Sequence, residues 1–341
     1  MPPELLRDIA ERTPGAALSV HGGRIALPIG EVTVEADIAI DTRTEIAIAC
    51  PGLDDFELSV RRGYALGARV AIADHWFEAA FDVTSNDAEL ARLWLDGETR
   101  AAAAWAQATR GLDDRPRNDY AFAVEGGRVL ATAPTPETSA QHLERAIRAA
   151  ATFALRPRGI ARDFRRLARR VGAAATSERW DLDGGFALVV ERPPAQVSIE
   201  NLRRLPDEPR AAARLRTRVR ARARGTAGGT DAFVVVPRRA RCAPPGVPAE
   251  ILPRLVPVIF DGTLGDNWTA HATTPAQLAR RLEDVAVHLL DEAEPDAILG
   301  VGAEVALLYE GMDTAPWRLG AAIELAARLV VVDRAVAGPY R

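Results

Sequence analysis

The sequence predicts an α+β protein that consists of one unit used twice in tandem. Each unit is expected to contain a helix, an antiparallel meander, a second helix, a hairpin and a final helix. Two observations favour this fold class. Segments with alternating apolar residues are grouped together, apart from the helical segments, as in helices packed on one face of a sheet. In addition, AAFDVTSNDAELARLWL at residues 79–95 has an echo, NWTAHATTPAQLARRL, at residues 267–282.

The first unit is predicted to cover residues 1–156. It opens with a short amphipathic helix at residues 4–12, which Pro14-Gly15 ends. A meander of short strands follows. Its clearest strand occupies residues 32–40, where apolar residues recur with the two-residue period of a half-buried strand.

The second part of this unit begins where a buried strand ends. Residues 85–87 (Ser-Asn-Asp) are good N-cap residues, so a helix is expected over residues 87–110. A glycine pair at residues 126–127 then predicts a hairpin, and a further helix is expected at residues 136–153. Residues 157–159 (Pro-Arg-Gly) are predicted to link the two units.

The second unit, residues 160–341, repeats this order of segments. The pairs, with the first unit's member given first, are residues 4–12 and 162–171, 24–27 and 186–190, 31–35 and 196–200, 44–50 and 217–223, 55–60 and 231–237, and 120–133 and 297–310. A final helix is expected at residues 315–332. The common order of these pairs, more than the likeness of any one pair, predicts a tandem duplication.

The first unit also combines Phe81-Asp82, a following Asp87 and Leu90, and the later glycine pair at residues 126–127. This combination resembles segments of uncharacterised bacterial protein families of unknown function. The resemblance implies no activity, because those families have none to transfer. The second unit departs from the pattern, since Trp268-Thr269 stands where Phe81-Asp82 would be.

Composition excludes several classes of protein. Apolar residues make up 48% and charged residues 26% of the chain, as in ordinary globular proteins. Cys50 and Cys242 are far apart, so no disulfide framework is expected. The N-terminus lacks the basic and apolar regions of a signal peptide, and no apolar run is long enough to span a membrane. We therefore expect a cytoplasmic protein without membrane insertion.

The sequence lacks the common motifs that indicate a cofactor site, a metal site or a catalytic nucleophile. It contains no GxxxxGK[ST] phosphate loop, no HExxH and no GxSxG. Gly300-Val301-Gly302 is only a fragment of a dinucleotide fingerprint and lies in a predicted hairpin. The five histidines are scattered: His21, His75, His142, His271 and His288. None is paired with another histidine or with a cysteine at i, i+4, so neither a metal nor a cofactor is expected.

Loop carboxylates leave one route to an enzyme open. Asp74 lies beside His75 in an irregular stretch between strands, and Asp261 and Asp266 fall in the equivalent stretch of the second unit. Catalytic groups often lie on such loops. The alternative function is therefore an enzyme that uses loop carboxylates in a cleft between the two units. The lack of a histidine beside Asp261 argues against it.

The most unusual feature is a run in which arginine occurs at every second residue. In a strand, this spacing places all the guanidinium groups on one face and the small apolar residues on the other. A helix would distribute the arginines around its circumference. The duplication independently predicts a strand here. The candidate anion-binding or partner-binding residues are Arg214, Arg216, Arg218, Arg220, Arg222 and Arg224.

Charge is also segregated along the chain. Residues 145–241 carry 23 arginines against 9 acidic residues, whereas residues 1–144 and 242–341 are net acidic. Two interpretations stay open: the arginine face is solvated or neutralised within the protein, or it binds an anionic partner. No aromatic residues are interleaved for base stacking, so an acidic protein is favoured over nucleic acid. We therefore predict a non-catalytic binding protein.

Overall fold

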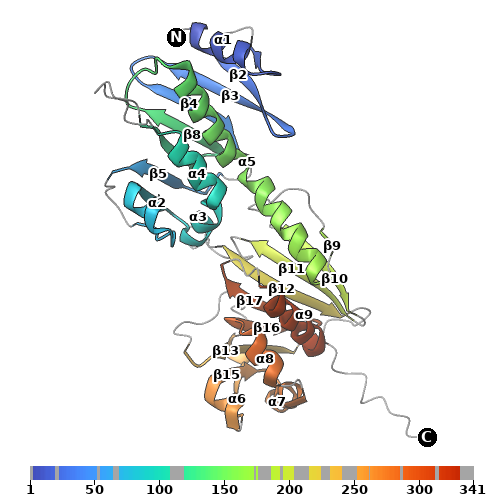
Figure 1. Ribbon diagram of the computed structural model, residues 1–341. Coiled ribbons are helices and arrows are strands. Elements are labelled where there is room, and N and C mark those ends of the chain that lie inside the picture. Colours follow the sequence, from blue (N-terminus) through green and yellow to red (C-terminus); the bar gives the residue numbers. More distant parts are fainter. Residues whose placement is uncertain are drawn as a thin grey trace, which may run out of the picture. The chain divides into compact units, whose positions relative to one another are not determined.

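The computed structural model describes most of the chain and shows two compact units (Figure 1). Unit 1 covers Met1–Ile160 and unit 2 covers Ala161–Arg341. Each unit has its own antiparallel sheet and its own helices, so the fold class is α+β as predicted. The residues described are 3–19, 23–51, 54–63, 69–107, 119–172, 174–175, 186–192, 195–202, 215–223, 231–239, 252–260, 262–284, 287–311 and 315–330.

Within its described residues, unit 1 contains an eight-stranded sheet in the order β1-β2-β3-β4-β8-β7-β5-β6. Its strands are β1 (Ala17–Leu18), β2 (Arg24–Ile29), β3 (Val32–Ile40), β4 (Thr44–Ala49), β5 (Leu58–Arg62), β6 (Phe81–Ser85), β7 (Ala121–Glu125) and β8 (Arg128–Ala133). Its helices are α1 (Pro3–Arg12), α2 (His75–Ala80), α3 (Ala88–Trp94), α4 (Gly97–Trp105) and α5 (Ala140–Arg170), the last of which continues into unit 2.

Unit 2 contains, in its described residues, a nine-stranded sheet in the order β14-β15-β13-β16-β17-β12-β11-β10-β9. Its strands are β9 (Ala174–Ala175), β10 (Phe186–Arg192), β11 (Ala195–Leu202), β12 (Arg216–Ala223), β13 (Ala232–Pro237), β14 (Val256–Val258), β15 (Trp268–Ala272), β16 (Ala297–Val301) and β17 (Glu304–Glu310). Its helices are α6 (Gly262–Asn267), α7 (Pro275–Asp284), α8 (Val287–Ala293), α9 (Pro316–Val330) and a 3-10 turn, η2 (Leu252–Arg254).

The two sheets have the same strand order. Starting from β1 and from β9, the strands correspond as β1 with β9, β2 with β10, β3 with β11, β4 with β12, β8 with β17, β7 with β16, β5 with β13, and β6 with β15. The additional strand β14 pairs with β15, where unit 1 has an isolated antiparallel bridge between Arg69 and Thr84 of β6. This common order fits the predicted duplication.

Two threonines set the correspondence residue by residue. The Thr44 hydroxyl of β4 donates to Thr135 O at 3.1 Å, two residues beyond the partner of Thr44 in β8. The Thr217 hydroxyl of β12 donates to Gly311 O at 3.0 Å, again two residues beyond its strand partner in β17. The same hydrogen bond closes the same strand pair in both units, and it supports the predicted alignment of β4 with β12.

Strand pairing corrects some of the predicted correspondences. The match of residues 120–133 with 297–310 is wrong by one residue, because Ala121 is the counterpart of Ala297, and another match is wrong by four residues. Residues 196–200 of β11 match residues 35–39 of β3, not 31–35, because Val197 and Ala36 hold equivalent positions beside β12 and β4. A shift of four residues keeps every side chain on its own face of the sheet. An alternating pattern therefore cannot distinguish the two registers, whereas strand pairing does.

Helix α5 runs without a break through the predicted linker at residues 157–159. Pro157 lies inside the helix, although proline removes one helical hydrogen bond and often kinks a helix. The buried stripe continues on both sides of it, with Phe153, Ile160 and Phe164 fully buried. Burial of this stripe outweighs the local penalty of the proline.

The predicted helix over residues 87–110 is instead divided into α3 and α4. Asp96 is the N-cap of α4, and its carboxylate accepts hydrogen bonds from Thr99 N and from the Thr99 hydroxyl, both at 2.8 Å. Such a cap satisfies the free N–H groups of a new helix start. The apolar spacing across residues 87–110 did not reveal this restart.

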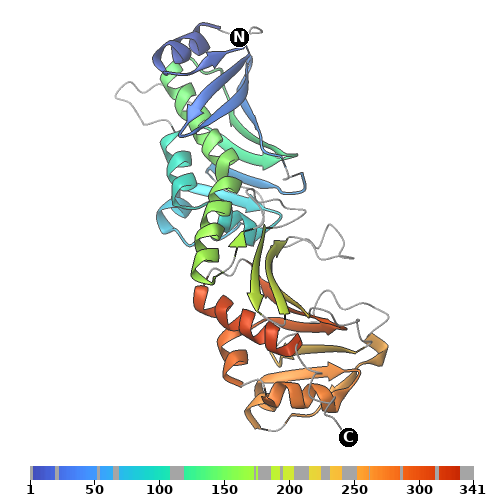
Figure 2. The ribbon, with the colours of Figure 1, turned by 90° about the vertical axis from the view of Figure 1, so that its right-hand side faces the viewer.

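Helices cover the apolar face of each sheet. In unit 1, Phe153 of α5 stacks on Phe122 of β7 with the ring centroids 5.1 Å apart. In unit 2, α9 lies along β11, β12 and β17 (Figure 2) and buries Val219, Ala221 and Leu307. Among the described residues, no helix combines the length and the apolar character that crossing a membrane requires.

Candidate functional site

The arginine run forms strand β12, as its alternation predicts. Val219 and Ala221 are buried on the face that packs against α9. Arg218 and Arg220 point to the opposite face and are partly exposed, and Arg222 on the same face is exposed. The strand thus separates its arginines from its apolar residues, as the two-residue period of a strand requires.

The ends of the run differ from its middle. Arg216 is only 7% exposed and stands opposite Glu310 of β17 in the sheet. Arg214 and Arg224 lie outside the described residues. Arg222 is the arginine of the described row that solvent reaches most freely.

Two glutamates hold the middle of the arginine row. Glu200 of β11 accepts a hydrogen bond from Arg218 Nε at 2.8 Å, and its other carboxylate oxygen lies 3.0 Å from Arg220 Nη2. Arg220 Nη1 also lies 3.6 Å from Glu304 Oε1 of β17. Glu200 is only 8% exposed, so removal of its partners would leave a largely buried charge. In contrast, no ion pair within the described residues involves Arg222.

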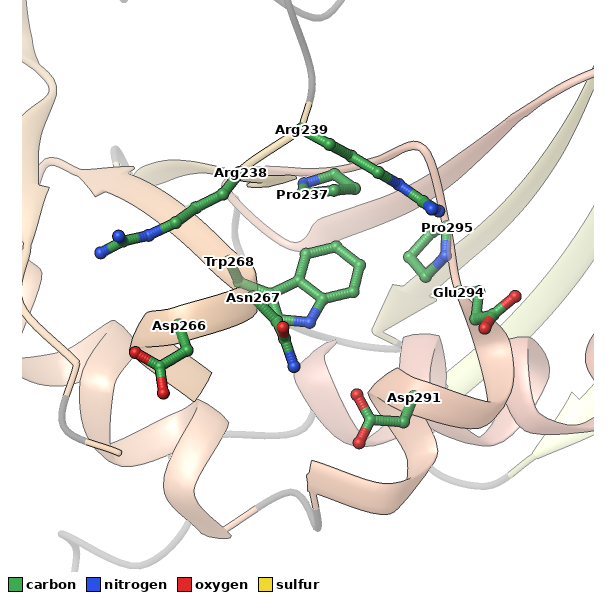
Figure 3. Close-up of a pocket in the computed structure, with 9 residues that line it drawn as sticks. All are labelled: Pro237, Arg238, Arg239, Asp266, Asn267, Trp268, Asp291, Glu294 and Pro295. Carbon is green, nitrogen blue, oxygen red and sulfur yellow. The ribbon is translucent and has the colours of Figure 1, made fainter. Parts of the chain in front are cut away.

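Unit 2 also contains a pocket of about 490 Å³, which the sequence did not predict (Figure 3). The pocket lies where β13 ends, β15 begins and α8 ends. Trp268, the first residue of β15, is 7% exposed and lies in the middle of the lining. The lining residues are Pro237, Arg238, Arg239, Asp266, Asn267, Trp268, Asp291, Glu294 and Pro295.

The charged side chains of the pocket are separated by sign. Arg238 and Arg239 lie on one side of Trp268, and Asp266 and Asp291 lie on the other (Figure 3). All four charged residues are exposed. Across the part of the chain that the structure describes, none of the four takes part in an ion pair. The pocket therefore has a cationic side and an anionic side.

Arg318 of α9 fixes the pocket wall at the end of α8. Its guanidinium donates to Ala293 O at 3.1 Å and to Glu294 O at 3.0 Å, which satisfies carbonyl groups at the helix end. It also lies 3.4 Å from the Glu294 carboxylate. Glu294 adopts a left-handed φ of 42°, as residues that end a helix often do. The third carboxylate of the pocket thus already has a cation.

An ion pair occupies the corresponding place in unit 1. Arg62, the last residue of β5, lies 3.2 Å from Asp119, which precedes β7. The strand pairings make Pro237 the counterpart of Arg62 and Pro295 the counterpart of Asp119. Because neither proline carries a charge, unit 2 cannot form this bridge.

Unit 1 has a histidine where unit 2 has Arg318. His142 lies seven residues after Thr135, and Arg318 lies seven residues after Gly311. His142 Nε2 lies 2.9 Å from Ala106 O at the end of α4, the same role that Arg318 has at the end of α8. A histidine and an arginine thus fix equivalent helix ends in the two units.

The surroundings of His142 favour its protonated form. Its Nδ1 lies 2.8 Å from Glu137 Oε2, so both ring nitrogens face acceptors. Burial lowers the pKa of His142, but the hydrogen bond and the charge of Glu137 outweigh burial and raise this pKa above its ordinary value. Burial raises the pKa of Glu137, but hydrogen bonds to its carboxylate outweigh burial and bring this pKa below its ordinary value. The donors are His142, Ser139 N and Thr138 N. This cluster holds α5 to α4.

The loop carboxylates of the alternative prediction occupy different settings. Asp74 is the N-cap of α2: its Oδ1 accepts from Phe77 N at 3.1 Å, and its Oδ2 lies 2.9 Å from Arg100 Nε. Both of its oxygens therefore have structural partners. Asp266 lines the pocket of unit 2, and Asp261 lies outside the described residues. The enzyme with a cleft between the units stays a prediction.

Comparison with known proteins adds no family to this description. No protein-family model matches the chain, and neither a curated protein nor a solved structure is similar to it.

Proposed function

We propose that the chain is a binding protein that takes an acidic segment of another protein on the β12 face of unit 2, with Arg220 and Arg222 as its contacts. One observation carries this proposal. Arg222 is exposed, has no ion pair within the described residues, and stands in a row whose neighbouring arginines are held in place by glutamates. Arg218 and Arg220, which Glu200 already holds in place, lose little side-chain freedom when a partner binds.

The charges on this face favour a protein over nucleic acid. Glu200 and Glu304 lie within the arginine row, and Glu310 stands at its end opposite Arg216. These carboxylates would repel a continuous phosphate backbone. A protein segment can place a carboxylate at Arg222 and neutral or basic groups beside the glutamates, so a mixed-charge surface suits a protein partner better.

Fluorescence anisotropy of a labelled glutamate-rich peptide tests the proposal on the full chain. The charge reversal Arg222→Glu should weaken binding of the peptide roughly tenfold at low salt, and added salt should reduce the difference. Arg128→Glu provides a matched control. Arg128 is an exposed arginine in the sheet of unit 1. It pairs with Ala49, and Ala49 is the counterpart of Arg222, so reversing the charge of Arg128 should leave peptide binding unchanged.

Two outcomes would contradict the proposal. Equal affinity of the wild type and Arg222→Glu for the peptide would remove Arg222 from any contact surface. Tighter binding of a single-stranded oligonucleotide of matched net charge, with the same loss in Arg222→Glu, would assign the face to nucleic acid instead. Arg218 is left unchanged in this design because its loss would remove a hydrogen bond from the buried Glu200 carboxylate and would destabilise the fold.

A further inference from the structure

We propose that the pocket of unit 2 binds a small zwitterion of the unblocked amino acid or dipeptide class. The anionic group would lie at Arg239 and the cationic group at Asp291, and Arg238 and Asp266 would add like charge on the same two sides of Trp268 (Figure 3). This inference does not depend on the β12 face, because the two sites share no residue.

On the cationic side, the Arg239 side chain extends toward Pro295 and can receive a carboxylate, whereas the Arg238 side chain extends in the opposite direction (Figure 3). Arg238 and Arg239 follow directly on β13, and Arg238 N donates to Asn267 O at 2.9 Å, which ties the end of β13 to the start of β15. Guanidinium groups present forked donors that match a carboxylate. Since no described acidic residue pairs with either arginine, a ligand carboxylate would displace no internal ion pair.

The anionic side is equally free to take an ammonium group. Asp291 lies in the last turn of α8, and Asp266 lies near the end of α6. Of the three carboxylates that line the pocket, Glu294 already pairs with Arg318. The other two, Asp266 and Asp291, form no ion pair with a described residue. The opposed charges flank Trp268 without pairing across it, so one molecule with both charges would satisfy both sides (Figure 3).

The remaining lining suits the body of such a molecule. Trp268, Pro237 and Pro295 supply apolar surface between the charged sides. Small-molecule sites combine apolar walls with a few placed polar groups and have volumes of roughly 300–1,000 Å³. The pocket, at about 490 Å³, falls in this range.

The duplication gives independent support. In unit 1 the last residue of β5, Arg62, forms an ion pair with Asp119. In unit 2 both positions are proline, and the arginines instead follow the strand as Arg238 and Arg239, where they line a pocket. The charges that serve the fold in unit 1 are thus replaced in unit 2 by charges that have no internal use in the described structure.

Isothermal titration calorimetry of the full chain with the dipeptide Leu-Gly tests the inference. Saturable binding is expected. N-acetylation or C-amidation of the dipeptide should each weaken it at least about tenfold, because each removes one charge-assisted interaction. Arg239→Ser and Asp291→Asn should weaken binding of the free dipeptide by a similar factor. Both replace exposed side chains, so both variants are expected to fold.

A second variant rebuilds the arrangement of unit 1. Pro237→Arg combined with Pro295→Asp would restore the ion pair of Arg62 and Asp119 at the edge of the pocket, and it should abolish binding without lowering the melting temperature. Arg128→Ser in unit 1 is the control and should bind as the wild type does.

Several results would overturn the inference. The inference is wrong if neither leucine nor Leu-Gly binds, or if the blocked dipeptides bind as tightly as free Leu-Gly. It is also wrong if inorganic phosphate binds as tightly as the dipeptide, or if Arg239→Ser and Asp291→Asn bind the dipeptide with wild-type affinity.

Discussion

The two units share a strand order but use charge differently at the same place. In unit 1 the end of β5 is bridged to the start of β7 by Arg62 and Asp119. In unit 2 the counterparts are Pro237 and Pro295, and the pocket beside them is lined by two arginines and two aspartates that form no ion pair in the described structure. The difference teaches that equivalent positions of a repeated strand pair can carry an ion pair in one unit and uncharged residues in the other.

The buried positions, by contrast, are retained. Leu143 of α5 and its counterpart Leu319 of α9 are both fully buried, as are Ala146 and its counterpart Ala322. Each pair sits on the stripe that a helix turns toward its sheet. Packing constrains these residues in both units, whereas the surface residues are free to diverge.

Where the cores do differ, two changes compensate each other. Leu58 of β5 pairs with Val124 of β7, and the corresponding pair in unit 2 is Phe233 and Gly300. A Cβ atom placed on Gly300 would lie 2.0 Å from the Phe233 ring. The larger ring of unit 2 thus occupies the space that the valine side chain fills in unit 1.

The largest expected effect comes from breaking this compensation. Gly300→Val should destabilise unit 2 by about 3 kcal/mol or more, because the strand backbone cannot move the new side chain away from the ring. The double variant Phe233→Leu, Gly300→Val gives unit 2 the pair of unit 1 and should recover most of the loss. Hydrogen exchange resolved by unit measures both.

The comparison of the two cores would fail if Gly300→Val kept the wild-type stability, or if the added Phe233→Leu change made the protein less stable still. Phe233→Leu alone is the matched control. It leaves a space beside Gly300 and should cost about 1 kcal/mol or somewhat more.

The order of elements along the chain and the faces of the strands were predictable because they follow from local chemistry, whereas the order of strands in the sheet was not: β5 was expected in the first meander but pairs with β6 and β7. Alternation and turn residues place strands, and the arginine at every second residue of β12 has only one arrangement in a strand. Register was not predictable in β11, since a shift of four residues leaves every face unchanged. The helix through Pro157 was missed because its stability comes from the burial of Phe153 and Ile160, which no local signal reports.

The pocket was missed for a related reason. Its arginines and aspartates lie 27 to 53 positions apart in the chain, and their convergence follows from the pairing of β13 with β15 and the position of α8. The contrast with unit 1 becomes visible only once strand pairing sets the register, which places two prolines at the positions of Arg62 and Asp119.

A smaller effect, dependent on pH, should separate the two helix-end contacts. His142→Gln should destabilise unit 1 by about 1–2 kcal/mol below the ordinary histidine pKa, where the histidine of both the folded and unfolded chain is charged. Because folding raises the pKa of His142, its contribution is lost as the pH rises through the folded value. Arg318→Gln should cost unit 2 a similar amount at every pH, since arginine stays charged.

Denaturant titrations of the wild type and the two variants from pH 5 to alkaline pH check this difference. At still lower pH the contribution of Glu137 is lost as well, because folding lowers its pKa. A His142→Gln effect that stays constant through neutral and alkaline pH would show that the ring acts only by packing.

The smallest expected effect concerns the ion pair that distinguishes the units. Both side chains of the Arg62–Asp119 pair are nearly half exposed, at 47% and 42%, so solvent screens their attraction. Arg62→Ala should therefore change the free energy of unfolding of unit 1 by less than about 1 kcal/mol, and salt should remove most of that change. Urea denaturation at low and high salt measures it. A small value means that the fold of unit 2 does not depend on an ion pair at Pro237 and Pro295. A loss of several kcal/mol would require another stabilising contact around these two prolines.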